Sequence, residues 1–183
     1  MLAELPPWAV VTEERSAHIG RVLELIDAWA AKLRVGPGEA RRWHRAALLH
    51  DAVKDADDEA LKALVGASDL PRALWHGPAA AELAVRDGER DQGVVDAIRW
   101  HTVGYAGWDR AGRALYLADY LEPGRRHDPE RAAFVARMPG EAPAVLREVA
   151  ARRIAWLKKQ GHPIHRQTWD FWNGLDAGDS SSW

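Results

Sequence analysis

The chain alternates between amphipathic helical segments and short breaks. After Thr12, apolar residues recur every three or four positions from Ile19 to Leu33, which predicts a helix that ends near Gly36. The same spacing, with Gly and Pro as breaks, predicts further helices over residues 39–53, 58–65, 78–88, 93–102, 110–121, 129–136, 142–160 and 165–173. No segment shows the strict alternation of a β-strand, so the predicted fold class is all-α, a single helical bundle.

Length and composition fit one globular domain. The 183 residues suffice for one core, and 47% apolar and 28% charged residues are typical of globular proteins. We therefore expect one domain over residues 1–175 and a disordered tail over 176–183. The helical periodicity places three tryptophans in the core, Trp29, Trp43 and Trp156.

The charge balance and the absence of cysteine exclude several classes of function. The net charge of -2 argues against a protein that binds long nucleic acids. Without cysteine, disulfides and thiolate metal sites are excluded, so any metal must be held by His, Asp or Glu, and the cytoplasm is the expected localisation. No window approaches the length of uninterrupted apolar sequence that a membrane helix needs, so no membrane association is expected.

Ionisable side chains fall on the apolar sides of these predicted helices. His18, His50, Asp51, His101 and Asp119 each lie about one turn from, or directly after, an apolar stretch. Burying a carboxylate without a partner costs several kcal/mol, so these groups need protons, partners or a cation. For each residue taken alone, a satisfied core histidine or a helix-terminal aspartate is the alternative. For the group as a whole, a metal ion is the simplest match.

The candidate ligands come from five helical segments, as in metal centres assembled in the cores of helical bundles. Imidazole and carboxylate ligands without thiolate suit iron, manganese, cobalt, nickel or zinc. Six ligands exceed the need of one four-coordinate ion, so we expect two ions that share a carboxylate. The predicted ligands are His18, His50, Asp51, His76, His101 and Asp119.

The order His, His-Asp, His, His, Asp resembles the HD-domain superfamily of metal-dependent phosphohydrolases. Four local segments are similar to the YqeK family, whose members are described as symmetrical bis(5'-nucleosyl)-tetraphosphatases. These are LLHDAVK at 48–54, AIRWHTVG at 97–104, YLADYLEPGR at 116–125 and GHPIHRQT at 161–168. The resemblance extends over residues 15–175, and Val103 stands where the family usually has a second Thr.

The resemblance implies a two-iron site with Asp51 as the bridge. His18, His50, Asp51 and Asp119 would hold one ion, and Asp51, His76 and His101 the other. One carboxylate can serve two ions in this way, and the pair of ions would activate water for attack on phosphorus.

Substrate contacts are expected close to the ligands. Lys54 and Arg125 would neutralise phosphate charge as catalytic and substrate-binding residues, together with the hydroxyl of Thr102. His165 and Asn173 fall in the last family segment and would approach the nucleotide. The alternatives are a helix-end lysine, a surface arginine, and capping roles for Thr102, His165 and Asn173.

The resulting hypothesis is an enzyme that hydrolyses diadenosine tetraphosphate, or a related dinucleoside polyphosphate, to two nucleoside diphosphates. Its partner is this small molecule, and a homodimer is compatible with the sequence. Two alternatives remain at this stage. One is an HD-domain phosphatase for mononucleotides or alarmones, and the other is a non-catalytic nucleotide-binding sensor.

Overall fold

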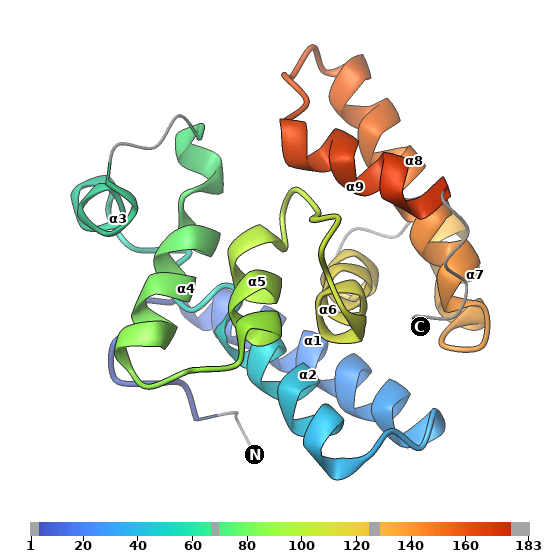
Figure 1. Cartoon of the computed structure of the whole chain (residues 1–183), viewed down its shortest axis with the longest axis horizontal. Helices are drawn as coiled ribbons and strands as arrows, with labels where there is room; N and C mark the ends of the chain where they lie inside the picture. The colour runs from blue at the N-terminus through green and yellow to red at the C-terminus, as the bar shows by residue number, and fades with distance from the viewer. Residues whose placement is uncertain (1–3, 67–69, 125–128, 177–183) are drawn as a thin grey trace.

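The computed structural model describes residues 4–66, 70–124 and 129–176, and over these ranges the regular structure is entirely helical (Figure 1). The predicted all-α class is therefore confirmed. The helices are α1 (Glu13–Lys32), α2 (Pro37–Leu49), α3 (Asp58–Val65), α4 (His76–Arg86), α5 (Gln92–Trp100), α6 (Arg110–Leu121), α7 (Pro129–Arg137), α8 (Ala142–Lys159) and α9 (Arg166–Asp176), with a 3-10 turn at Arg72–Leu74.

Several helices begin at a side chain that caps the first free backbone N–H groups. The Thr12 hydroxyl accepts a hydrogen bond from the backbone N of Arg15, 3.2 Å away. Three aspartates do the same for later helices, Asp57 for α3, Asp91 for α5 and Asp109 for α6. Because such caps satisfy donors that the helix itself cannot, each fixes where its helix starts.

The hydrophobic core lies among the first six α-helices and is extended by the last three. Helix α1 packs on α2, α4 on α5, and α6 on α1, α2 and α5. The centre of this core holds fully buried side chains, including Ile26, Trp43, Leu49 and Leu115. Helices α8 and α9 pack on each other, and α7 and α8 reach the core through α6 (Figure 1).

Arg42 on α2 ties together the starts of two neighbouring helices. Its Nε donates to Asp91 Oδ2 at 2.7 Å and its Nη1 to Glu39 Oε2 at 2.7 Å. It also donates to Asp109. Since Asp91 and Asp109 are the N-caps of α5 and α6, one guanidinium fixes the register of three helices.

Two expectations about helix ends and core residues differ from the structure. Helix α2 ends at Leu49 rather than at residue 53, because residues 50–55 form successive turns. Trp29 and Trp43 are buried as expected, whereas Trp156 is 46% exposed, so its assignment to the core was wrong. Its ring lies on the surface beside Arg153 and His162.

The described part of the chain ends with α9. Residues 177–183 of the expected tail lie outside the described residues, and Asp176 ends α9. Among the described helices, none has the length and apolar character to cross a membrane.

Candidate metal centre

The six predicted ligands come from separate elements and meet at one place in the bundle. His18 lies on α1 and Asp119 on α6, and His76 is the first residue of α4. The remaining three follow directly after helix ends, His50 and Asp51 after α2 and His101 after α5. The early end of α2 contributes to this arrangement, since the His-Asp pair lies in a turn instead of continuing a helix.

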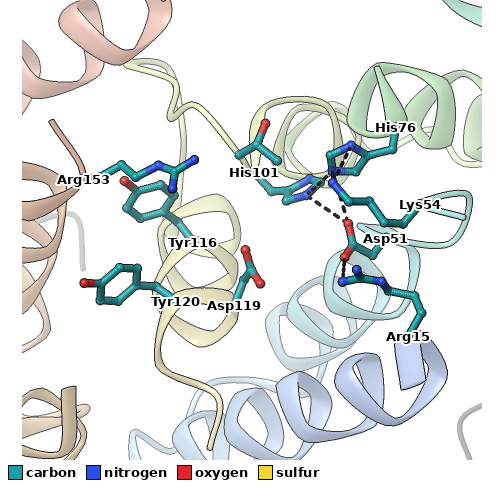
Figure 2. Close-up of a pocket in the computed structure, with 10 residues that line it drawn as sticks. Arg15, Asp51, Lys54, His76, His101, Tyr116, Asp119, Tyr120 and Arg153 are labelled. Carbon is teal, nitrogen blue, oxygen red and sulfur yellow. Dashed lines mark hydrogen bonds and ion pairs between the residues drawn. The ribbon is translucent and has the colours of Figure 1, made fainter. Parts of the chain in front are cut away.

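Asp51 is the centre of the cluster, and Figure 2 shows its contacts on the side of His76 and His101. Its Oδ1 lies 3.3 Å from His76 Nε2 and 3.4 Å from His101 Nε2. Its Oδ2 lies 3.8 Å from the Nε2 atoms of both His18 and His50. One carboxylate oxygen therefore faces each pair of histidines.

Two groups of three ligand atoms result, and both include Asp51. Within the group His18, His50 and Asp51, and within the group Asp51, His76 and His101, all ligand atoms lie within 4.8 Å of one another. Asp119 lies next to the first group, with its Oδ1 3.2 Å from His18 Nε2. The structure thus brings all six predicted ligands together at one place.

The hydrogen bonds of the imidazoles leave their inner nitrogens free to bind a cation. His50 Nδ1 lies 2.7 Å from the Ala47 carbonyl, and His101 Nδ1 lies 2.8 Å from the Ile98 carbonyl. A nitrogen that faces a carbonyl oxygen must carry the hydrogen, so in the neutral rings both Nε2 atoms hold lone pairs. Such outer hydrogen bonds are typical of histidines that bind metals.

A divalent cation fits this site because acceptor atoms converge on it. Asp51 Oδ1 is buried and accepts no hydrogen bond. His76 Nε2 and His101 Nε2 lie 3.1 Å from each other, and both point toward this oxygen. Buried acceptors that converge in this way are unfavourable unless a positive charge lies close to them. The donor set, imidazole nitrogen and carboxylate oxygen, is one that divalent transition metals favour.

Burial keeps two of the histidines in the form that metals require. It lowers the pKa of His50 to about 4 and that of His76 to about 4, so both rings are neutral at neutral pH. Burial alone would raise the pKa of Asp51, but the surrounding histidines, with His50 foremost, hold it well below its ordinary value. His50 and His76 are therefore neutral imidazoles beside an ionised carboxylate.

Two cationic side chains lie beside the cluster. Lys54 Nζ lies 3.1 Å from His76 Nδ1, and burial lowers the pKa of Lys54. Arg15 Nη1 donates to Asp51 Oδ2 at 2.6 Å. Lys54 was expected here, but Arg15 was not, although its position three residues before His18 places both on one face of α1.

Glu122 is a second residue that the sequence analysis missed. It is buried just after α6, and its Oε1 lies 3.3 Å from His18 Nδ1. Its Oε2 accepts from Arg21 Nε at 2.6 Å and from the backbone N of Gly124 at 2.7 Å. Burial alone would raise the pKa of Glu122. The hydrogen bonds from Arg21 and Gly124, together with His18, outweigh burial and hold this pKa below its usual value. An ionised Glu122 draws the hydrogen of His18 to Nδ1, so that Nε2 faces Asp51 and Asp119 with its lone pair.

A cavity of about 240 Å³ opens over the cluster (Figure 2). Asp51, Lys54, His76 and His101 line one side, and Thr102 lies beside them as expected. Three lining residues that the sequence analysis missed complete the wall, Tyr116, Tyr120 and Arg153.

Two predicted substrate residues, His165 and Asn173, do not line this cavity in the structure. His165 lies before α9, and its Nδ1 accepts from the backbone N of Gln167 at 3.4 Å, which is a capping contact. Asn173 is exposed on α9. Arg125 lies outside the residues that the structure describes.

The fold and the cluster define an all-helical domain with a buried site suited to divalent metal ions. Residues 15–124 match the family model of the HD domain, and the chain belongs to this family. This confirms the resemblance that the motifs indicated.

Relatives of similar length support a hydrolase. The symmetrical bis(5'-nucleosyl)-tetraphosphatase of Bacillus subtilis strain 168 is 26% identical over 180 residues, which cover 92% of each chain. The enzyme of that name from Staphylococcus aureus is 27% identical over 91% of this chain and 89% of its own. A crystal structure from Clostridium acetobutylicum, described as a predicted HD superfamily hydrolase involved in NAD metabolism, has a TM-score of 0.78 at 24% identity and 90% coverage of both chains. At that identity the structure supports the fold alone.

Proposed function

We propose that this HD-domain hydrolase cleaves diadenosine tetraphosphate, or a related dinucleoside polyphosphate, symmetrically to two nucleoside diphosphates. The observation that carries the proposal is the division of Asp51 between two groups of buried histidines, with the ammonium group of Lys54 beside them. Relatives that match this chain over about nine-tenths of its length carry the name of that activity.

The proposed cofactor is a pair of transition-metal ions. His18, His50, Asp51 and Asp119 would hold one ion, and Asp51, His76 and His101 the other. Iron is the first candidate, with manganese, cobalt, nickel and zinc as the alternatives that the nitrogen and oxygen ligands admit. When bound, such ions supply Lewis acidity and activate water near neutral pH.

The side chains around the ions position the phosphate chain. Lys54 and Arg15 offer positive charge on the side of His76 and Asp51, and Thr102 offers a hydroxyl at the cavity wall. Charge-assisted hydrogen bonds from such groups become stronger as charge develops on the phosphate oxygens. The substrate roles of Arg125, His165 and Asn173 stay predictions.

The bond that breaks is the central P–O–P linkage. Water adds its oxygen to one inner phosphorus, and the bridging oxygen leaves with the other half of the molecule. Both products are then ADP, and one of them carries the oxygen of water in its terminal phosphate.

Product analysis tests this proposal. Protein loaded with metal and incubated with diadenosine tetraphosphate should give ADP alone, and labelled water should leave its oxygen in half of the ADP molecules. ATP and AMP in equal amounts would contradict the symmetric cleavage. Phosphate release from mononucleotides without cleavage of the dinucleotide would favour a phosphatase, and binding without turnover would favour a sensor.

Lys54→Ala gives a second test. This variant should keep its metal ions but lose turnover by roughly 2 to 4 kcal/mol of transition-state stabilisation, the effect of removing one preorganised charged donor. Unchanged turnover would show that Lys54 does not act on the substrate.

A further inference from the structure

The cavity has a second wall that the proposed metal ligands do not use. Helix α6 contributes Tyr116 and Tyr120, and α8 contributes Arg153. In Figure 2 these three side chains stand across the cavity from Lys54 and Arg15, with Asp119 between the two sides. The cavity thus has cationic groups on opposite sides.

Packing holds this wall in place. Tyr116 is buried, and its ring contacts Trp108 and Phe171 with centroids 5.7 and 5.4 Å away. Tyr120 lies one helical turn after Tyr116 and therefore on the same face of α6. The guanidinium of Arg131 covers its ring at 5.1 Å. Tyr116 is thus fixed in the protein interior, and the partly buried Tyr120 is covered by Arg131.

Arg153 is the cationic side chain of this second wall. Its guanidinium lies 5.0 Å from the centroid of the Trp156 ring, which orients the side chain. None of the carboxylates in residues 4–66, 70–124 and 129–176 forms an ion pair with it, whereas the adjacent Arg152 pairs with Glu130. A guanidinium that lines a cavity in this way is suited to bind an oxyanion such as phosphate.

The size of the cavity indicates what it accommodates. At about 30 Å³ for each water-sized group, 240 Å³ holds about eight such groups. This is enough for about two phosphate groups but not for a nucleoside as well. The nucleosides of a dinucleotide would therefore extend beyond the cavity, and only phosphates would occupy it.

We propose that Arg153, with the hydroxyls of Tyr116 and Tyr120, forms a second phosphate subsite, which binds the phosphates farther from the metal centre. This inference rests on the proposed function. The subsite selects substrates by the length of the phosphate chain, because a single phosphate on the ions does not reach it. Burial raises the pKa of Tyr116, so its hydroxyl remains a donor.

Binding measurements on the manganese-loaded protein test the subsite apart from turnover. The probes are inorganic tripolyphosphate and orthophosphate, with metal content and released phosphate measured in the same samples. Arg153→Met should weaken tripolyphosphate binding roughly tenfold or more and leave orthophosphate binding within about twofold. Tyr120→Phe should act in the same direction and more weakly.

Arg152→Met is the matched control, because it removes the same charge from the same helix but on the side that faces Phe134. It should leave the affinities for both probes unchanged. Equal losses for both probes in Arg153→Met, or equal effects of the two arginine variants, would overturn the subsite. If the wild type binds tripolyphosphate through Arg153 but cleaves no dinucleoside polyphosphate, the subsite stands and the proposed function fails.

Discussion

Glu122→Gln changes one hydrogen-bonding group beneath the proposed metal centre. The carboxylate accepts on both sides, from His18 at one oxygen and from Arg21 and Gly124 at the other. A glutamine has only one acceptor oxygen. If that oxygen faced His18, the amide nitrogen would oppose two donors, so the oxygen should turn to Arg21 and Gly124. The amide N–H then points at His18 Nδ1 and moves the ring hydrogen to Nε2.

The expected loss of metal affinity follows from the lone pair that His18 Nε2 no longer offers. With the hydrogen on Nε2, the ring no longer offers a lone pair toward Asp51 and Asp119. Changing such an outer partner typically weakens metal affinity roughly 10- to 100-fold, about 1.4 to 2.7 kcal/mol. The group Asp51, His76 and His101 does not contact Glu122, so its affinity should stay within about twofold of wild type.

Competition with a coloured chelator measures both affinities, and long-range proton–nitrogen NMR of the metal-free protein reports which nitrogen of His18 carries the hydrogen. Arg21→Gln is the matched control. It removes the same ion pair but leaves the carboxylate of Glu122 facing His18, so the tautomer should not change. If Glu122→Gln binds both ions with wild-type affinity, or if Arg21→Gln weakens binding equally, Glu122 does not orient His18.

The remaining predictions concern the ions, their pH dependence and the scaffold. Metal analysis should find two ions for each wild-type chain and none in Asp51→Ala, whereas His101→Ala should keep one ion and its helical circular dichroism but lose turnover; two tightly held ions in Asp51→Ala would refute the bridge. Because the neutral forms of His50 and His76 bind metal and their pKa values are about 4, metal content should hold as the pH falls to 6 and decline toward 4; a midpoint near the ordinary histidine pKa of about 6.5 would contradict this. Arg42→Gln should lower the free energy of unfolding by roughly 2 kcal/mol in denaturant titrations without changing metal content, since it releases the N-caps of α5 and α6; loss of metal in this variant would show that the network also supports the site.

The helices were predictable because their apolar spacing and capping residues are local signals. The end of α2 was not, because it depends on a distant segment. Val10 donates its backbone N–H to the Ala52 carbonyl at 2.8 Å, and the backbone N of Thr12 donates to Asp55 Oδ2 at 2.8 Å. These contacts join the turn after Asp51 to the segment before α1, and they replace the helical pattern that the sequence favours locally.

Some residues of the candidate site could likewise be predicted from local sequence spacing, and others depend on distant packing. Arg15 and Glu122 lie three residues from His18 and Asp119, so helical spacing could have indicated both of them. Arg153 has no such signal. It reaches the cavity only because α8 packs on α6, more than thirty residues away in sequence from Asp119.

Two of the candidate ligands, His50 and His101, directly follow helix ends, and this position determines which of their nitrogens can bind a metal. Helix ends leave backbone carbonyls without partners, and the Ala47 and Ile98 carbonyls are used here to fix the rings of His50 and His101. A histidine just after a helix can turn back to such a carbonyl and present its other nitrogen inward. Two ligands therefore follow helix ends for the same physical reason, and the core that gathers those ends around Asp51 also determines which lone pairs face it.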